Sequence, residues 1–266
     1  MNAMDKILLE EHPADGVVVL RLNRPAVLNA LNLALRQALA EAFDRLDLDA
    51  AVKVIILAGS ERAFCAGADL NEYVDATPSD ILAREMDRLW GAVSRCRKPV
   101  IAAVRGHALG GGCELAMHAD ILLAGHGARF GQPEVGIGIM PGGGATQRLT
   151  RAVGKFAAMK ILLCGERFTA TDAAAMGLVS ELVDDALVET RAVQMATQLA
   201  TLPVLSLRYI KEAVLEGMNL PLEQGLQFER KSFQLLFSTT DKTEGMRARL
   251  EKRVPAFSGN ISECKL

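Results

Sequence analysis

The chain has 266 residues, half of them hydrophobic, which is enough for one substantial core or for a core with an appended helical part. Its formal net charge of -2 at pH 7 provides no long-range attraction to nucleic acid or to an anionic membrane. No segment approaches the roughly 18 uninterrupted apolar residues that cross a bilayer, and no apolar region follows basic residues at the N-terminus. We therefore expect neither a nucleic-acid partner nor a membrane partner.

The predicted elements begin with a β-hairpin. Strand-like segments at 6–10 and 17–22 are joined by Pro13-Ala14-Asp15-Gly16, which has the chemistry of a turn. Apolar residues then recur at spacings of three or four, and this pattern predicts a helix with one face on the core. The residues of this apolar stripe are Leu28, Leu31, Leu35, Leu39, Phe43 and Leu46.

A strand-then-helix rhythm continues through the following segments. Strands are predicted at 54–58, 100–104 and 121–124, and helical segments at about 81–94 and 113–118. This order favours parallel strands joined by right-handed crossovers, so the predicted fold class is α/β.

From residue 145 the pattern changes to helices with short breaks. Helices are predicted at 145–153, 155–164 and 171–176, and a strand at 178–183. Everything beyond Asp185 has helical periodicity, interrupted near Pro203, Gly217 and Pro221. The second half of the chain is therefore expected to add helices rather than more sheet.

Two glutamates beside glycine-rich backbone are the main candidates for chemistry. Glu114 follows Gly110-Gly111-Gly112-Cys113, and Glu134 precedes the run Pro141-Gly142-Gly143-Gly144. Glycines let the backbone approach a ligand closely, so that N–H groups can meet developing negative charge while carboxylates move protons. A third segment, from Ala63 to Leu70, has small residues directly after a predicted strand and leaves its amides accessible.

At these residues the chain resembles the crotonase superfamily, the enoyl-CoA hydratases and isomerases. The resemblance covers nearly the whole chain. Its further blocks are Leu22-Asn23-Arg24-Pro25, Leu28-Asn29-Ala30-Leu31, Thr146-Gln147-Arg148-Leu149 and Glu251-Lys252-Arg253. It implies a crotonase-like spiral of β-β-α turns at residues 1–198. It also implies a C-terminal helical region at residues 199–266 that closes the pocket and assembles the chain into a homotrimer or a homohexamer of two trimers.

The resemblance implies roles for five site residues. The amides of Ala68 and Gly111 form an oxyanion hole for the thioester oxygen. Glu114 accepts a proton from water, Glu134 supplies a proton to the α carbon of the substrate, and the amide of Gly142 orients the water. When two carboxyl groups share one water in a partly buried pocket, ionising both of them costs free energy. We therefore expect at least one of them to have a raised pKa.

Contacts to coenzyme A are also implied by the resemblance, and coenzyme A is then part of the substrate rather than a separate cofactor. They involve Ala26, Leu28, Ala30, Ala66, Ala68, Asp69, Leu70, Gly111, Phe233 and Lys252. No metal is expected, because the four histidines show neither a His-Glu-x-x-His pattern nor a mixed cysteine cluster.

The presence of both glutamates favours a hydratase, which adds water across the 2,3 double bond of an enoyl-CoA. The alternatives are a double-bond isomerase, for which the second glutamate alone suffices, and a non-catalytic RNA-binding or assembly member of the family. The stretches Ala66 to Glu72 and Gly138 to Pro141 look most like bacterial hydratases of phenylacetate breakdown that act on 2,3-dehydroadipyl-CoA. A short straight-chain enoyl-CoA, as in fatty acid β-oxidation, is equally compatible with the sequence.

Cysteine usage indicates a reducing compartment. The five cysteines are an odd number and form no Cys-x-x-Cys pair, so we expect a cytoplasmic location. The last residues, Cys264-Lys265-Leu266, are similar to the peroxisomal Ser-Lys-Leu signal, which would matter only in a eukaryote.

Overall fold

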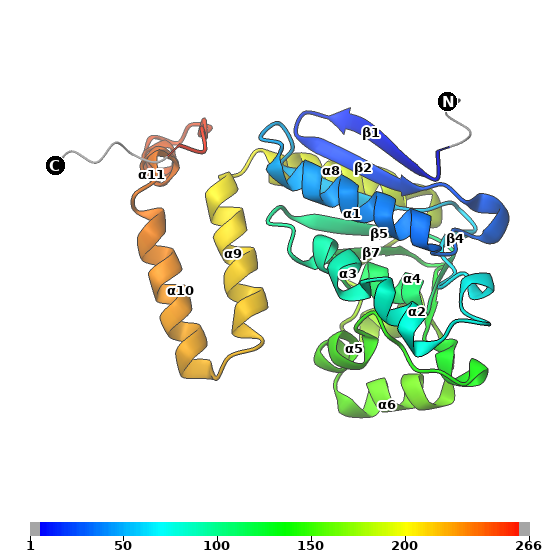
Figure 1. Cartoon of the computed structure of the whole chain (residues 1–266). Coiled ribbons are helices and arrows are strands. Elements are labelled where there is room, and N and C mark those ends of the chain that lie inside the picture. The colour runs from blue at the N-terminus through cyan, green and yellow to red at the C-terminus, as the bar shows by residue number, and fades with distance from the viewer. Residues whose placement is uncertain (1–5, 261–266) are drawn as a thin grey trace.

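A long strand, a short strand and a helix follow one another in the same order three times in the computed structural model, which describes residues 6–260. The long strands are β3 (Val54–Ala58), β5 (Val100–Val104) and β7 (Ile121–Gly125). The short strands are β4 (Ala63–Cys65), β6 (His107–Leu109) and β8 (Arg129–Gly131). The helices are α2 (Pro78–Ala83) with α3 (Met86–Ser94), then α4 (Gly111–Ala116), then α5 (Ala145–Val153). This repeat confirms the predicted α/β spiral of β-β-α turns (Figure 1).

The long strands belong to a large sheet with the order β1-β2-β3-β5-β7-β10. Its neighbouring strands are parallel except in the predicted hairpin of β1 (Leu8–Ala14) and β2 (Val17–Leu22), and β10 (Glu181–Val183) is the last strand. All residues of β3 and β5 are buried, because both faces of the sheet are covered. One face packs in a cluster with α1 (Leu33–Leu48), and the other packs on α8 (Val188–Ala200).

The short strands form a second sheet with the order β4-β6-β8-β9, where β9 is Arg167–Thr169. The periodicity of the sequence did not reveal these strands, because three residues are too few to show an alternation of apolar and polar positions. Helices α6 (Lys155–Cys164) and α7 (Ala170–Ala175) flank β9 and agree with the predicted helices in this part of the chain.

The first predicted helix begins later than expected from the apolar stripe that starts at Leu28. Helix α1 begins at Leu33, where the side chain of the N-cap residue Asn32 accepts a hydrogen bond from the first turn. Leu28 and Asn29 have φ angles of 52° and 57°, in the left-handed region that a right-handed helix cannot contain. The buried side chain of Asn29 donates to two carbonyl groups of β4 at 3.0 and 3.2 Å and thereby holds this loop in place.

Three helices beyond α8 form an arm beside the core (Figure 1). They are α9 (Val204–Gly217), α10 (Leu222–Leu236) and α11 (Thr240–Glu251). These helices confirm the helical region predicted beyond Asp185, and none of the helices in residues 6–260 is long and apolar enough to span a bilayer. The C-terminal tripeptide Cys264-Lys265-Leu266 lies outside the described residues.

A buried ion pair attaches the arm to the core. The ammonium group of Lys211, on α9, lies 2.7 Å from the carboxylate of Asp120 and donates to the carbonyl oxygen of Lys98 at 2.8 Å. The side chains of Lys211 and Asp120 are only 9% and 20% exposed, so the two charges depend on each other.

Replacement of Lys211 by methionine is expected to destabilise the protein by about 3 kcal/mol, because the carboxylate of Asp120 then stays buried without a partner. Urea unfolding of the variant and the wild type measures the difference. The double variant Lys211→Met with Asp120→Asn should recover most of the loss, since neither charge remains. A single variant as stable as the wild type would contradict this account of the pair.

Candidate functional site

Two backbone segments meet so closely that only glycine fits at the contact. Gly67 has a φ of 109°, and a Cβ atom there would lie 2.9 Å from the carbonyl oxygen of Leu109 and 3.7 Å from the amide nitrogen of Gly111. A Cβ atom on Gly111 would in turn lie 3.7 Å from the amide nitrogen of Ala68. The amides of Ala68 and Gly111, which the sequence predicted as a pair, are therefore neighbours.

Neither of these two N–H groups donates to another protein group within residues 6–260. Gly111 is the first residue of α4, where the N–H groups of a helix have no partner inside the helix. Ala68 is held from the other side by its bridge to Leu31, which uses the carbonyl of Gly67 and the amide of Asp69 and not the amide of Ala68. Two adjacent unpaired donors of this kind can stabilise an oxygen that gains negative charge.

Glu114 lies one turn into α4 and is only 3% exposed. Its Oε1 atom accepts hydrogen bonds from the amides of Gly143 and Ala145 at 2.7 and 3.0 Å. Burial raises the pKa of this carboxyl group, and the two amides and the charge of Arg36 oppose the rise because they stabilise the ionised form. Its Oε2 atom accepts no hydrogen bond within the described residues, so it is available to a ligand or a water.

Glu134 lies in the short 3-10 helix η4 (Pro133–Ile137) and is 9% exposed. Burial and, to a smaller extent, the negative charge of Glu114 together raise its pKa to about 7. A Cβ atom on Gly110 would lie 2.7 Å from Oε1 of Glu134, which places this carboxyl group directly beside the start of α4. The structure thus brings Glu114 and Glu134 to the same helix end as the two unpaired amides.

The predicted residue Gly142 is exposed, and a Cβ atom there would meet nothing within 4 Å. The amide that contacts Glu114 belongs to the next residue, Gly143. Gly142 therefore adjoins in the chain a residue that contacts Glu114, but within the described residues its own amide donates to neither carboxyl group.

Sequence reasoning missed several residues that position the two carboxyl groups. Gly143 and Ala145 are the donors to Glu114, and they could have been found as the amides that begin α5. The fully buried Gln132, with its amide nitrogen turned toward Glu134, donates to both carboxyl oxygens at 3.2 Å. No periodic signal in the sequence distinguishes this glutamine.

His118 contacts the main chain of Glu114, and Trp90 packs on His118. The imidazole Nδ1 of His118 lies 2.8 Å from the main-chain oxygen of Glu114, and its ring stacks on Trp90 with 5.0 Å between ring centroids. Burial and, to a smaller extent, the charge of Arg148 lower the pKa of His118 to about 4, so the ring is neutral at pH 7. Within residues 6–260, no group of three or more His, Cys, Asp and Glu side chains is arranged to hold a metal.

The residues predicted to contact coenzyme A fall into two groups. The loop with Ala26, Leu28 and Ala30 runs beside the loop from Ala66 to Leu70, because the amide of Ala66 donates to the carbonyl of Leu28 at 2.9 Å. An ion pair of 3.1 Å between Arg24 and Asp69 also joins these loops.

Phe233 and Lys252 are not near these loops in the same chain. Phe233 lies on α10 and Lys252 follows α11, and both helices are on the far side of α9 from the core (Figure 1). The other predicted site residues, in contrast, all belong to the core, at the loops around β4, α4 and η4.

Comparison with known proteins gives a consistent result over the whole chain. A family model described as enoyl-CoA hydratase/isomerase matches residues 12–260. A probable enoyl-CoA hydratase of Mycobacterium tuberculosis is 44% identical over 256 residues, which cover 96% of this chain and 98% of the relative. The 2,3-dehydroadipyl-CoA hydratase of Escherichia coli is 44% identical over 243 residues, or 91% and 95% of the two chains. The crystal structure of an enoyl-CoA hydratase from Bacillus anthracis matches with a TM-score of 0.92 at 34% identity, covering 96% of this chain and 100% of the other.

Replacement of Glu134 by glutamine is expected to raise the free energy of unfolding by about 2 kcal/mol at pH 8 and to leave it nearly unchanged at pH 4. The pKa of Glu134 is about 7 in the folded protein, above its ordinary value of 4.5. The stability that the protonated Glu134 side chain contributes is therefore complete below about pH 4.5 and is lost as the pH rises through 7. Glutamine does not titrate, so the variant does not lose stability in this way.

Urea unfolding at pH 4, 6 and 8 measures this dependence. Glu223→Gln is the matched control, since that side chain is 69% exposed. A gain for Glu134→Gln of the same size at every pH would mean that the carboxyl group does not carry the raised pKa.

Proposed function

The chain belongs to the enoyl-CoA hydratase/isomerase family, and we propose that it adds water reversibly across the 2,3 double bond of an enoyl-CoA thioester. The observation that supports this most directly is the pair of buried carboxyl groups, Glu114 and Glu134, at the helix end that also presents two unpaired amides. Hydration needs a base, an acid and shelter for an enolate, and these groups can supply all three.

The amides of Ala68 and Gly111 bind the thioester oxygen in the proposed reaction. Their hydrogen bonds polarise the carbonyl and stabilise the oxygen as it gains charge, an effect of about 3 kcal/mol for each donor in comparable sites. Withdrawal of electrons toward this oxygen makes the β carbon electrophilic. The same two donors then hold the enolate until its α carbon is protonated.

Glu114 and Glu134 divide the proton transfers. Glu114 receives two backbone hydrogen bonds on Oε1, which favour its ionised form, and its Oε2 accepts the proton of the attacking water. The water oxygen bonds to the β carbon, and Glu134 gives its proton to the α carbon. A pKa of about 7 suits Glu134 to this role, because a substantial fraction is protonated at neutral pH. Dehydration runs through the same steps in reverse.

Glu114→Gln and Glu134→Gln are each expected to lower kcat for crotonyl-CoA hydration by about 1,000-fold, because each removes one proton transfer. Loss of the conjugated enoyl absorbance measures the rate, and Glu223→Gln serves as the control with full activity. If the wild type leaves crotonyl-CoA unchanged but converts a 3-enoyl-CoA into its conjugated isomer, the protein is a double-bond isomerase. If neither variant loses activity, the acid and base assignment is wrong.

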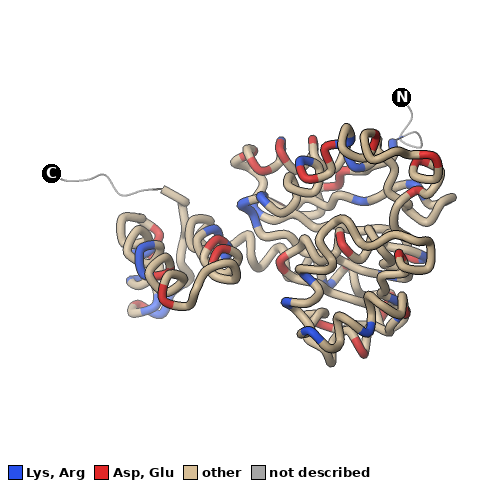
Figure 2. Tube along the Cα trace, turned by 60° about the horizontal axis from the view of Figure 1, so that its bottom comes forward, with Lys and Arg blue, Asp and Glu red and all other residues tan. Residues whose placement is uncertain are grey.

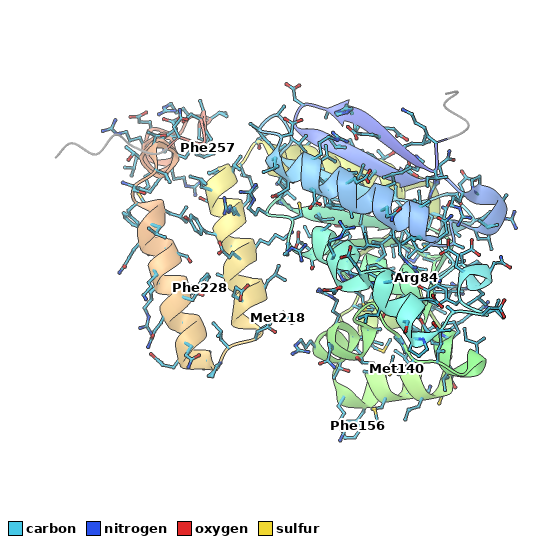
Figure 3. All side chains as sticks on the ribbon, viewed as in Figure 1. Arg84, Met140, Phe156, Met218, Phe228 and Phe257 are labelled. Atoms are coloured by element: carbon cyan, nitrogen blue, oxygen red, sulfur yellow. The ribbon has the colours of Figure 1, made fainter. Side chains whose placement is uncertain are left out.

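We also propose that the arm assembles the chain into a homotrimer or a homohexamer. Figure 2 shows basic and acidic residues interspersed over both the core and the arm, so charge does not single out a docking face. Exposed apolar side chains follow one another along α9, where Ile210 and Val214 are 60% and 58% exposed, and Met218, directly after α9, is 51% exposed. Figure 3 shows Met218 near the end of α9, and Phe233 on α10 is also 61% exposed.

A second copy packed on this surface would bury these side chains. It would also give Phe233 and Lys252 a site to contact, since α10 and α11 lie on the far side of α9 from the loops of their own chain (Figure 1). These two residues are therefore assigned to the coenzyme A site of a neighbouring copy.

Light scattering is expected to give the mass of three or six chains for the wild type and a smaller mass for Ile210→Glu with Val214→Glu, because burying a charge at an apolar interface is unfavourable. Leu48→Glu, which changes a 78% exposed leucine on α1, is the matched control and should keep the native mass. A monomeric wild type would refute the proposed assembly.

A further inference from the structure

Arg36 is a buried cation that forms no ion pair in the part of the chain that the structure describes. It lies on α1, only 5% of the residue is exposed, and no carboxylate among residues 6–260 lies within 4.0 Å of its guanidinium group. One nitrogen donates to the hydroxyl of Tyr73 at 2.7 Å. The carboxylate of Glu72 approaches the same helix, but both of its oxygens accept hydrogen bonds from the amide of Leu33, at 3.1 and 2.9 Å. The positive charge of Arg36 is therefore not neutralised by a direct partner.

Apolar side chains lie between Arg36 and the proposed base. Arg36, Trp90 and Leu115 line one small cavity, and the rest of its lining is aliphatic. Leu115 follows Glu114 in the chain. A Cβ atom on Gly143 would lie 2.7 Å from Oε2 of Glu114 and 2.8 Å from the ring of Trp90, so this ring lies beside the carboxyl group as well as beside the cavity. Charges separated by hydrocarbon are screened far less than charges in water, so Arg36 can act on Glu114 without touching it.

Other ionisable groups also lie around Glu114, and they do not supply this positive charge. Burial raises the pKa of the Cys113 thiol to about 12 and lowers that of His118 to about 4, so both are neutral at pH 7. Glu134 opposes the ionisation of Glu114, because two negative charges repel each other. The charge of Arg148, on α5, lowers the pKa of His118, whereas the charge of Arg36 lowers that of Glu114.

We propose that Arg36 is a positioning residue for the hydration reaction, and that its buried charge holds Glu114 in the ionised form that accepts a proton from water. The inference rests on the proposed function, in which Glu114 is the base. No hydrogen bond joins the two side chains in the described residues, so Arg36 acts through its electric field and takes no part in the proton transfer itself. A base has to be ionised before it can accept a proton, so the charge of Arg36 extends the range of pH over which Glu114 can act.

A purely structural role is the alternative for Arg36, because its hydrogen bond joins α1 to the segment that contains Tyr73. That role predicts that a substitution lowers turnover by the same factor at every pH. The positioning role predicts a loss that grows as the pH falls, because removal of the positive charge makes Glu114 harder to ionise and raises its pKa.

Titration of Trp90 fluorescence in the substrate-free protein measures the ionisation of Glu114. Trp90 is the only tryptophan of the chain, and its ring lies beside Gly143, which also contacts Glu114. His118 stacks on the same ring, so the transition that disappears in Glu114→Gln is the one that belongs to Glu114. In Arg36→Met this transition is expected at least about one pH unit higher than in the wild type, which is a tenfold change in the ionisation constant.

The acidic limb of kcat for crotonyl-CoA hydration is expected to move up by the same amount in Arg36→Met. Arg36→Lys keeps a positive charge and should restore most of the shift. Arg84→Met is the matched control. Arg84 is a second cation beside Tyr73 (Figure 3), with its Cζ atom 4.6 Å from the ring centroid, but it does not line the cavity, so its replacement should leave the transition in place.

An unchanged transition in Arg36→Met would overturn the inference, as would an equal shift in Arg84→Met. Thermal unfolding verifies that each variant is folded, and Arg36→Gln, which keeps a donor for Tyr73, applies the same criterion should Arg36→Met not fold. A wild type that leaves crotonyl-CoA unchanged would refute the proposed function. The fluorescence titration uses no substrate, so it still decides whether Arg36 keeps Glu114 ionised.

Discussion

The close approach of two backbone segments at glycine residues is the constraint on which the candidate site depends. Gly67 and Gly110 have φ angles of 109° and 50°, and a Cβ atom on Gly112 would collide with the carbonyl oxygen of Cys65. With no side chain between them, the loop after β4 and the start of α4 come into contact, and the amides of residues 68 and 111 become neighbours. The same contact fixes where α4 begins and therefore where Glu114 lies, one turn further on. A larger residue at any of these glycines would move the helix, and the amides and the carboxylate would move with it.

The two glutamates differ in their surroundings, and in the proposed reaction this difference lets one act as base and the other as acid. Glu114 is the more buried, yet two backbone amides and the charge of Arg36 counteract the effect of burial on its pKa. Glu134 lacks such compensation from a cation and also lies within the field of Glu114, so its pKa is raised to about 7. Two groups of the same chemical type thereby have pKa values that are set by different surroundings. The arrangement has a cost in stability, because an ionised Glu134 is held in a poorly solvated place.

The sequence predicted the long elements of the fold well, because each carries a periodic or strongly apolar signal. The strands at 54–58 and 100–104 and the helices that follow residue 145 lie where the patterns placed them. The small sheet was not predicted, since its strands have three residues each and contain no period to detect. The predicted start of the first helix at Leu28 was wrong for a different reason. The side chain of Asn29 forms hydrogen bonds to β4 and holds the backbone in a left-handed loop, which the spacing of apolar residues cannot predict. Glu114 and Glu134 stood out because of the adjacent glycines. Gly143 contacts Glu114 from a segment 29 residues further along the chain, and Gln132 lies two residues before Glu134 but belongs to no periodic pattern that would mark it.

Arg36 shows that an apolar stripe with helical spacing can include a buried charged residue that hydrophobicity alone does not mark. It stands three residues before Leu39 and seven before Phe43, so helical spacing places it on the same buried stripe as these two core residues. A charged residue on such a stripe is rare, because charges are seldom buried without a partner. The hydroxyl of Tyr73 accepts a hydrogen bond from Arg36, and the positive charge of Arg36 opposes the rise in the pKa of the buried Glu114. The position of this residue therefore connects the helix that builds the core with the electrostatics of Glu114.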